Sequence, residues 1–137
     1  ELASIQSKFN KEMYNSKFKD ELKKEYGDIF NFVTKEKAMK NSDVIINVMN
    51  LTKNPDSKFY NVGYFSDIEF LMAKKGLIFI NVTRGEIAPE SILLKYYKEG
   101  ILSGIALDVF SNESTLVSSS NENSLKTNPI AKANLIV

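Results

Sequence analysis

Two short stretches of the chain are apolar at successive positions, residues 44–48 and 77–81. A strand with one face in solvent alternates apolar and polar residues, whereas a strand covered on both faces is apolar throughout. We therefore expect two buried strands of a parallel sheet, covered by helices on both sides. Residues 12–15 and 105–107 are also rich in β-forming side chains and extend the predicted sheet.

Segments with helical spacing lie between these strands. Residues 20–26 and 34–40 carry mixed charge with apolar residues at intervals of three to four, and Gly27 is suited to cap the first of them. Residues 1–10 resemble a helix interior, so we expect a helix at the start of the chain.

Capping chemistry marks two further helix starts. Ser66 and Glu69 have the spacing of a capping box ahead of an apolar run. Pro89 and Glu90 suit the first turn of a helix that continues to Gly100, because proline fits there and an acid favours the positive end of the helix dipole. The alternation of strands and helices predicts an α/β fold with a parallel sheet and right-handed crossovers.

Composition narrows the function classes. The 137 residues are the size of one domain, and the net charge is only +1, with the lysines of residues 17–24 and 35–40 interleaved with acids. This pattern argues against nucleic acid as the main partner. Cysteine is absent, which excludes a disulfide framework and a thiolate metal site and fits a cytoplasmic protein. No apolar run approaches the ~20 residues of a membrane span, and we expect neither a membrane partner nor a bound metal.

Polar, glycine and small apolar residues follow the predicted strands. In an open parallel sheet, ligands bind beyond the carboxyl ends of the strands, where loops and free backbone N–H groups converge. The sequence therefore predicts a ligand site formed by residues 15–17, 47–50 and 82–85 and by Asp108.

Two motifs at this edge resemble those of a known family. INVTRGE at residues 80–86 is similar to the family's asparagine, two small residues and Arg-Gly, and GIALDVFSNES at residues 104–114 to its Ala-Leu-Asp-Val-Phe signature followed by an acid. Further segments that resemble this family follow in the family's order, at residues 41–52, 91–104 and 128–137. On these residues the chain resembles a partial NAD(P)-binding domain of the D-isomer-specific 2-hydroxyacid dehydrogenases, similar to phosphoglycerate dehydrogenase and glyoxylate-hydroxypyruvate reductase.

The resemblance implies a Rossmann-like, doubly wound parallel sheet and an oxidoreductase that moves a hydride between NAD or NADP and a small D-2-hydroxy acid or 2-oxo acid. It also implies a homodimer formed through the nucleotide-binding domain. The family's first strand and glycine-rich phosphate loop would precede this chain, its catalytic histidine would follow Val137, and its substrate domain would lie outside. The sequence contains no histidine, so we expect residues 1–137 alone to be inactive.

The resemblance carries two catalytic roles to this sequence. Arg84 would hold the substrate carboxylate and polarise the 2-keto group, tasks that suit a planar, permanently charged guanidinium. Glu113 would hydrogen-bond the catalytic histidine, fix its ring and raise its pKa. A strand-end salt bridge is the structural alternative for Arg84, and a solvated loop acid is the alternative for Glu113.

Three residues would meet the nicotinamide end of the cofactor. Asp108 resembles the family position that contacts this end, with helix or loop capping as the structural alternative. Val82 and Thr83 would lie beside the ring through their backbone and small side chains. For Val82, ordinary core packing is an equal alternative.

The adenosine side would be lined by Asn47, Val48 and Met49, again with core packing as the alternative for the apolar pair. Ser16 and Lys17 lie where dinucleotide folds select the 2′ substituent of the ribose. An acid there favours NAD, whereas a hydroxyl and a cation accept a 2′-phosphate, so the sequence favours NADP slightly over NAD. An exposed lysine without such a role is the alternative.

Two other functions stay open at this point. A dinucleotide-sensing binding protein on the same fold would need no turnover, although the presence of both Arg84 and Glu113 favours the enzyme. A generic α/β domain without a cofactor is what periodicity alone supports. The sequence does not determine which 2-hydroxy acid is the substrate, because the selecting side chains would belong mostly to the other domain.

Overall fold

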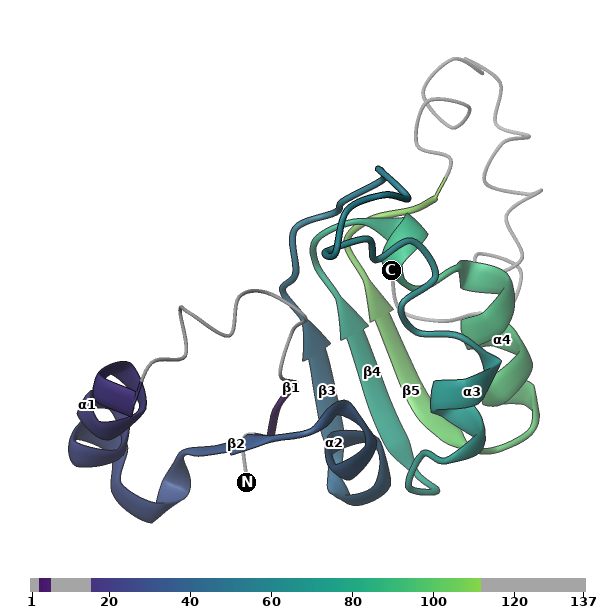
Figure 1. Cartoon of the computed structure of the whole chain (residues 1–137). Helices are drawn as coiled ribbons and strands as arrows, with labels where there is room; N and C mark the ends of the chain where they lie inside the picture. The colour runs from purple at the N-terminus through teal and green to yellow at the C-terminus, as the bar shows by residue number, and fades with distance from the viewer. Residues whose placement is uncertain (1–2, 6–15, 112–137) are drawn as a thin grey trace.

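Three parallel strands form the main sheet of the structure, and a second parallel pair lies beside it (Figure 1). The structure is a computed structural model and describes residues 3–5 and 16–111. β3 (Val44–Asn47), β4 (Leu77–Asn81) and β5 (Leu102–Leu107) lie in that order, and β1 (Ala3–Ile5) pairs with β2 (Asn31–Val33). All pairings are parallel, so the predicted α/β fold with a parallel sheet is confirmed.

The first two helices each have a local capping residue, of which Gly27 was predicted. α1 (Ser16–Tyr26) is followed by Gly27, whose φ of +59° is a left-handed conformation that glycine adopts at low cost. α2 (Lys35–Asn41) begins after Thr34, whose hydroxyl accepts a hydrogen bond from the Lys37 backbone N–H. Both helices therefore follow from local sequence.

α3 (Asp67–Leu71) and α4 (Glu90–Lys98) connect the strands of the three-stranded sheet. The capping box predicted for α3 is present, with the Ser66 hydroxyl capping the first turn and the Glu69 carboxylate accepting from the Ser66 backbone N–H at 2.8 Å. α4 begins directly after Pro89, as predicted.

One face of the three-stranded sheet carries the hydrophobic core, which α2, α3 and α4 cover (Figure 1). Phe79 of β4 lies among aromatic neighbours, with its ring centroid 4.8 Å from that of Phe65 and 5.5 Å from that of Phe70. Strands and helices both contribute to this cluster, which includes Ile45, Leu77, Phe79, Leu102, Ile105, Leu107, Met39, Phe70, Leu93 and Tyr96.

The opposite face of this sheet is partly exposed, whereas the sequence predicts strands covered on both sides. Val44 and Ile46 of β3 are 40% and 45% exposed, and Ile78 of β4 is 39% exposed. Burial of a face needs a covering element, and α2, α3 and α4 all pack against the other face. An apolar run shows which residues favour burial but not which segment covers them.

The start of the chain also differs from the prediction. Residues 3–5, expected within a helix, form β1 and pair in register with residues 31–33 of β2. Pairing with a distant strand overrides a local helical preference. β2 has no counterpart among the predicted strands, although Phe32 and Val33 are β-forming residues. The predicted strand at residues 12–15 lies outside the described residues.

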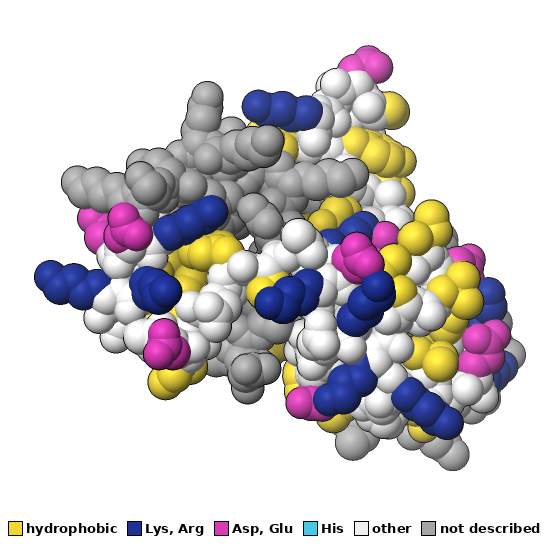
Figure 2. All heavy atoms as spheres, turned by 60° about the horizontal axis from the view of Figure 1, so that its bottom comes forward, with side chains coloured by type: hydrophobic (Ala, Val, Ile, Leu, Met, Phe, Trp, Pro, Cys, Tyr) yellow, Lys and Arg dark blue, Asp and Glu magenta, His cyan; other side chains and the backbone are white. Residues whose placement is uncertain are grey.

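Charged side chains of both signs share the surface. Figure 2 shows lysines and arginines close to aspartates and glutamates, not gathered into one patch. Lys40 pairs with Glu36 one helical turn away, and Lys74 pairs with Asp43. In the described part of the chain, no helix combines the length and apolar character that crossing a membrane requires.

Candidate functional site

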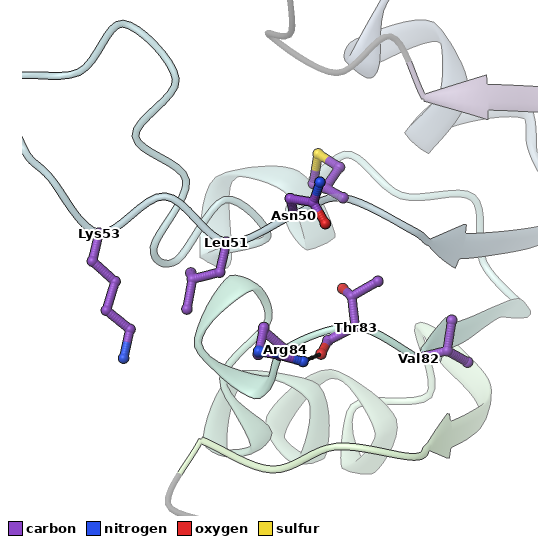
Figure 3. A pocket seen from close by; sticks show the side chains of 7 residues that line it. Asn50, Leu51, Lys53, Val82, Thr83 and Arg84 are labelled. Atoms are coloured by element: carbon purple, nitrogen blue, oxygen red, sulfur yellow. Dashed lines mark hydrogen bonds between the residues drawn. The ribbon is translucent and has the colours of Figure 1, made fainter.

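A pocket of about 680 Å³ lies at the carboxyl ends of β3 and β4 (Figure 3). Because the two strands are parallel, the segments that follow them leave the sheet at the same edge. These segments form the two walls: Met49, Asn50, Leu51 and Lys53 after β3, and Val82, Thr83 and Arg84 after β4. The pocket therefore lies at the edge where the sequence predicts a ligand site.

Two buried asparagines hold these walls together. Asn47 and Asn81 end β3 and β4, are register partners, and are 1% and 0% exposed. Asn47 Nδ2 donates to Asn81 Oδ1 at 2.8 Å and to the Thr83 hydroxyl at 2.9 Å, while Asn47 Oδ1 accepts from the Met49 backbone N–H at 3.1 Å. Asn81 Nδ2 donates to the Arg84 carbonyl at 2.9 Å. Since a buried amide is costly unless it is hydrogen-bonded, the pair fixes the backbone of both walls.

A third buried asparagine, Asn61, shapes the first wall from the far end of its loop. Its Nδ2 donates to the Asn50 carbonyl and its Oδ1 accepts from the Thr52 backbone N–H, both at 2.7 Å. The loop between β3 and α3 contains no helix or strand. Side-chain hydrogen bonds therefore satisfy backbone groups that a sheet or helix would otherwise pair.

Two cations line the pocket, and the lining residues include no acid. Lys53 Nζ lies 2.7 Å from Glu86 Oε1 outside the lining, and this hydrogen bond from Lys53 is the main reason that the pKa of Glu86 is below its usual value. Arg84 is exposed, and its Nη1 donates to the Thr83 carbonyl at 2.7 Å. The pocket therefore suits an anionic group. Within residues 3–5 and 16–111, no group of three acids, histidines or cysteines is placed to hold a metal ion.

Gly85 lets a third segment close against the second wall. A Cβ atom at this position would lie 2.2 Å from the Phe110 carbonyl carbon and 2.2 Å from the Ser111 backbone nitrogen. No side chain fits there, because the obstructing atoms belong to the backbone. The glycine of the Arg-Gly motif thus allows the segment after β5 to lie next to Arg84.

Four of the ten predicted site residues line the pocket, namely Met49, Val82, Thr83 and Arg84. Asn47 is not among the lining residues, because its side chain is buried behind them and bonds within the protein. Val48 does not line the pocket either, and it is 70% exposed.

The other predicted site residues are Asp108, Ser16, Lys17 and Glu113. Asp108 leaves β5 at the same edge, where its backbone N–H donates to the Asn81 carbonyl at 3.1 Å. Ser16 and Lys17 begin α1, which lies apart from the carboxyl edge of the three-stranded sheet (Figure 1), and the strand expected before them lies outside the described residues. Glu113 lies outside the described residues.

Sequence reasoning missed Leu51 and Lys53 as lining residues and gave no role to Asn61 or Asn81. No local pattern reveals the path of the loop that carries Lys53. Asn81 did carry a signal, because an asparagine that ends an otherwise apolar strand needs a specific partner.

Known proteins match this chain over most of its length. Residues 2–136 match the family model described as D-isomer specific 2-hydroxyacid dehydrogenase, NAD binding domain. Glyoxylate reductase from Thermococcus onnurineus is 31% identical over 102 residues, which cover 74% of this chain and 28% of that protein. D-3-phosphoglycerate dehydrogenase 3, chloroplastic, from Arabidopsis thaliana is 44% identical over 48 residues, which cover 35% of this chain and 8% of that protein.

Solved structures show the same fold. The D-isomer specific 2-hydroxyacid dehydrogenase from Lactobacillus delbrueckii ssp. bulgaricus, in its NAD complexed form, matches with a TM-score of 0.65 at 20% identity, over 87% of this chain and 32% of that one. D-lactate dehydrogenase from Aquifex aeolicus, complexed with NAD and lactic acid, matches with a TM-score of 0.57 at 25% identity, over 70% of this chain and 29% of that one. These likenesses confirm the predicted Rossmann-like fold class.

Proposed function

The chain belongs to the family of D-isomer specific 2-hydroxyacid dehydrogenase NAD-binding domains, and from this premise we propose that it is the cofactor-binding part of an oxidoreductase. The proposed reaction is hydride transfer between a nicotinamide dinucleotide and a small D-2-hydroxy acid or 2-oxo acid. The chain spans 28% of the Thermococcus onnurineus glyoxylate reductase that it matches, so the activity is proposed for the whole protein. The observation that carries the proposal is an exposed arginine in a pocket at the carboxyl edge of the parallel sheet.

The pocket fits part of a dinucleotide. Its volume of about 680 Å³ lies within the roughly 300–1,000 Å³ of small-molecule sites. Val82 and Thr83 offer backbone groups and small side chains to a planar ring, and Met49 and Leu51 offer apolar surface on the other wall. A nicotinamide dinucleotide bound there supplies the hydride.

Arg84 is the residue proposed to bind the substrate carboxylate. Its guanidinium is planar and always charged, so it can pair with a carboxylate through two parallel hydrogen bonds. The bond that it now makes to the Thr83 carbonyl is exposed, and a carboxylate can replace it at little cost. The same positive charge stabilises negative charge that develops on the 2-keto oxygen during the reaction.

The proton is proposed to come from a histidine outside residues 1–137, because the chain contains none. Glu113 would hydrogen-bond this histidine and hold its ring in place. Asp108 would contact the nicotinamide end of the cofactor. Its position at the carboxyl edge, directly after β5, supports this role.

Finer assignments belong to the same proposal. Glyoxylate is the first substrate to test, because glyoxylate reductases are among the relatives. Ser16 and Lys17 favour NADP over NAD, which kcat/KM measured with NADPH and with NADH would decide. The protein is further proposed to be a cytoplasmic homodimer. Sedimentation of the full-length protein as a monomer would contradict the proposed dimer.

The test of the proposed function uses the full-length protein that carries this chain. Absorbance loss of NADH or NADPH is followed in the presence of glyoxylate and other 2-oxo acids. Arg84→Ala should lower kcat/KM by about a hundredfold, because a charge-assisted hydrogen bond contributes about 1.5–3 kcal/mol. Arg84→Lys keeps the positive charge but not the paired hydrogen-bond donors, so its kcat/KM should lie between that of the unaltered protein and that of Arg84→Ala.

Two outcomes would contradict the assignment. Unchanged kcat/KM in Arg84→Ala would remove the proposed role of the guanidinium. Binding of NADH without reduction of any 2-oxo acid would instead indicate a dinucleotide-sensing protein on the same fold.

A further inference from the structure

The Thr83 hydroxyl takes part in one short hydrogen bond, from Asn47, and one long hydrogen bond, to Asn81. We infer that it donates a hydrogen bond to a carboxyl or carboxamide oxygen of the ligand in the pocket, and that Asn47 is the positioning residue that directs this hydrogen. The inference rests on the proposed function, because it deepens the same site. The ligand oxygen belongs either to the nicotinamide carboxamide or to the substrate carboxylate.

Asn47 controls the direction of the Thr83 hydroxyl. An amide nitrogen can only donate, so the 2.9 Å contact from Asn47 Nδ2 makes the Thr83 oxygen an acceptor. Asn47 cannot rotate to reverse this arrangement, because its second N–H bonds Asn81 and its oxygen bonds the Met49 backbone. At 1% exposure the side chain also has no access to solvent.

The hydrogen of the Thr83 hydroxyl is left with a poor acceptor inside the protein. The distance from Thr83 Oγ1 to Asn81 Oδ1 is 3.4 Å, whereas hydroxyl hydrogen bonds are commonly about 2.7–2.8 Å long. That Asn81 oxygen already accepts from Asn47 at 2.8 Å. A ligand oxygen at normal distance would therefore be the better acceptor.

Thr83 is one of the residues that a ligand in the pocket would contact. Thr83 lines the pocket, and Figure 3 shows its side chain on the wall between Val82 and Arg84. Two apolar residues at positions 47 and 81 would pack in the core without burying amides. The amide pair instead fixes the Thr83 hydroxyl and the Arg84 backbone, and both residues line the pocket.

The test measures the dissociation constant of NADH by fluorescence and the KM for glyoxylate in the full-length protein. Thr83→Val removes the hydroxyl but keeps the side-chain shape, and Thr83→Ser keeps the hydroxyl. We expect about tenfold weaker binding for Thr83→Val, equivalent to one lost hydrogen bond, and near-normal binding for Thr83→Ser.

Variants of Asn47 test the positioning role. Asn47→Asp replaces the amide donors by a carboxylate, so the Thr83 hydroxyl should turn to donate to residue 47 and binding should weaken as in Thr83→Val. The double variant Asn47→Asp/Thr83→Val should bind no more weakly than either single one, because both remove the same bond. If the buried carboxylate of Asn47→Asp prevents folding, Asn47→Leu can replace it, because leucine also lacks the amide donors but adds no charge. Asn47→Leu should likewise weaken ligand binding.

Tyr96→Phe is the matched control. It also removes a hydroxyl, which bonds Asp67 at 2.9 Å between α4 and α3, but Tyr96 does not line the pocket. It should lower the unfolding temperature without changing either binding constant.

Each outcome decides the inference. A change in the NADH dissociation constant supports it and places the oxygen on the cofactor, whereas a change only in the KM for glyoxylate supports it and places the oxygen on the substrate. Variants of Thr83 and Asn47 that bind both ligands as Tyr96→Phe does would overturn it. If the Thr83 and Asn47 variants weaken NADH binding as expected but the unaltered protein reduces no 2-oxo acid, only the proposed function is contradicted. If the unaltered protein does not bind NADH, both the inference and the proposed function are contradicted.

Discussion

At Gly85 the backbone of a distant segment occupies the space where a side chain would begin. Phe110 and Ser111 follow β5, and their backbone atoms approach the glycine more closely than a Cβ atom allows. The Ser111 hydroxyl donates to Glu90 Oε2 at 2.7 Å, which holds this segment against α4. The absence of a side chain at Gly85 therefore allows the segments after β4 and β5 to lie in close contact.

Gly85→Ala should destabilise the protein. The new Cβ has to displace backbone atoms, and overpacking of this kind costs about 1–3 kcal/mol of unfolding free energy. Gly104→Ala is the control, because a Cβ there would lie 3.6 Å from the Ile78 side chain, an ordinary contact. Urea unfolding should show a clear loss for Gly85→Ala and little change for Gly104→Ala, and equal losses would refute this explanation.

At the scale of elements, one carboxylate joins α2 to α3. Glu69 caps its own helix through Ser66 and also lies 2.5 Å from Lys35 Nζ of α2. Burial alone would raise the pKa of Glu69, but the hydrogen bonds from Lys35 and Ser66 outweigh burial and hold this pKa below its usual value of 4.5. Lys35 Nζ also lies 4.0 Å from the centroid of the Tyr64 ring, and burial, followed by the charge of Glu69, raises the pKa of Tyr64 to about 12.

This link predicts a specific acid sensitivity. A carboxyl group whose pKa is lower in the folded state stabilises the protein above its unfolded pKa, and the contribution is lost as the pH falls through the folded value. Glu69→Gln should lower the unfolding free energy by about 2 kcal/mol at pH 7 and by much less at pH 3. Urea unfolding at both pH values measures the difference.

Glu36→Gln is the control for this experiment, because Glu36 forms an exposed pair with Lys40 within α2. Exposed pairs contribute little to stability, so the effect of this variant should be small at either pH. A pH dependence as large as that of Glu69→Gln would show that the α2–α3 link is not the cause.

At the scale of the whole molecule, the two faces of the three-stranded sheet differ. Phe79 lies in the core with no exposure, whereas Ile78 and Ile46 on the other face are 39% and 45% exposed. Apolar burial contributes to stability in proportion to the area removed from water. Neighbouring residues of one strand should therefore respond very differently to substitution.

Phe79→Ala should lower the unfolding free energy by about 3–5 kcal/mol, the usual cost of removing a large core side chain. Ile46→Thr and Ile78→Thr should each cost less than about 1 kcal/mol, and together they should reduce the binding of a fluorescent hydrophobic dye to residues 1–137. Strong destabilisation by the threonine variants would show that this face is covered in solution.

Much of the architecture could be predicted because it depends on near neighbours in the sequence. The capping box of Ser66 and Glu69, the glycine after α1 and the start of α4 at Pro89 all follow from residues a few positions apart. The sequence-based prediction placed Arg84 and Thr83 at the edge of the sheet where they line the pocket, because parallel strands leave a sheet at one edge. It did not foresee that Asn47 lies behind the pocket, since the direction of a strand-end side chain depends on its cross-strand partner.

The sequence alone therefore determined the alternation of strands and helices from α2 to β5, the capping box of α3, the glycine after α1 and the edge at which the pocket forms, because spacing and capping act within a few residues. Only the tertiary structure decided that residues 3–5 pair as a strand, that one sheet face stays partly exposed, and that Asn47 and Asn81 join the two walls of the pocket. Each of these depends on a partner far away in the chain, and no local pattern specifies that partner.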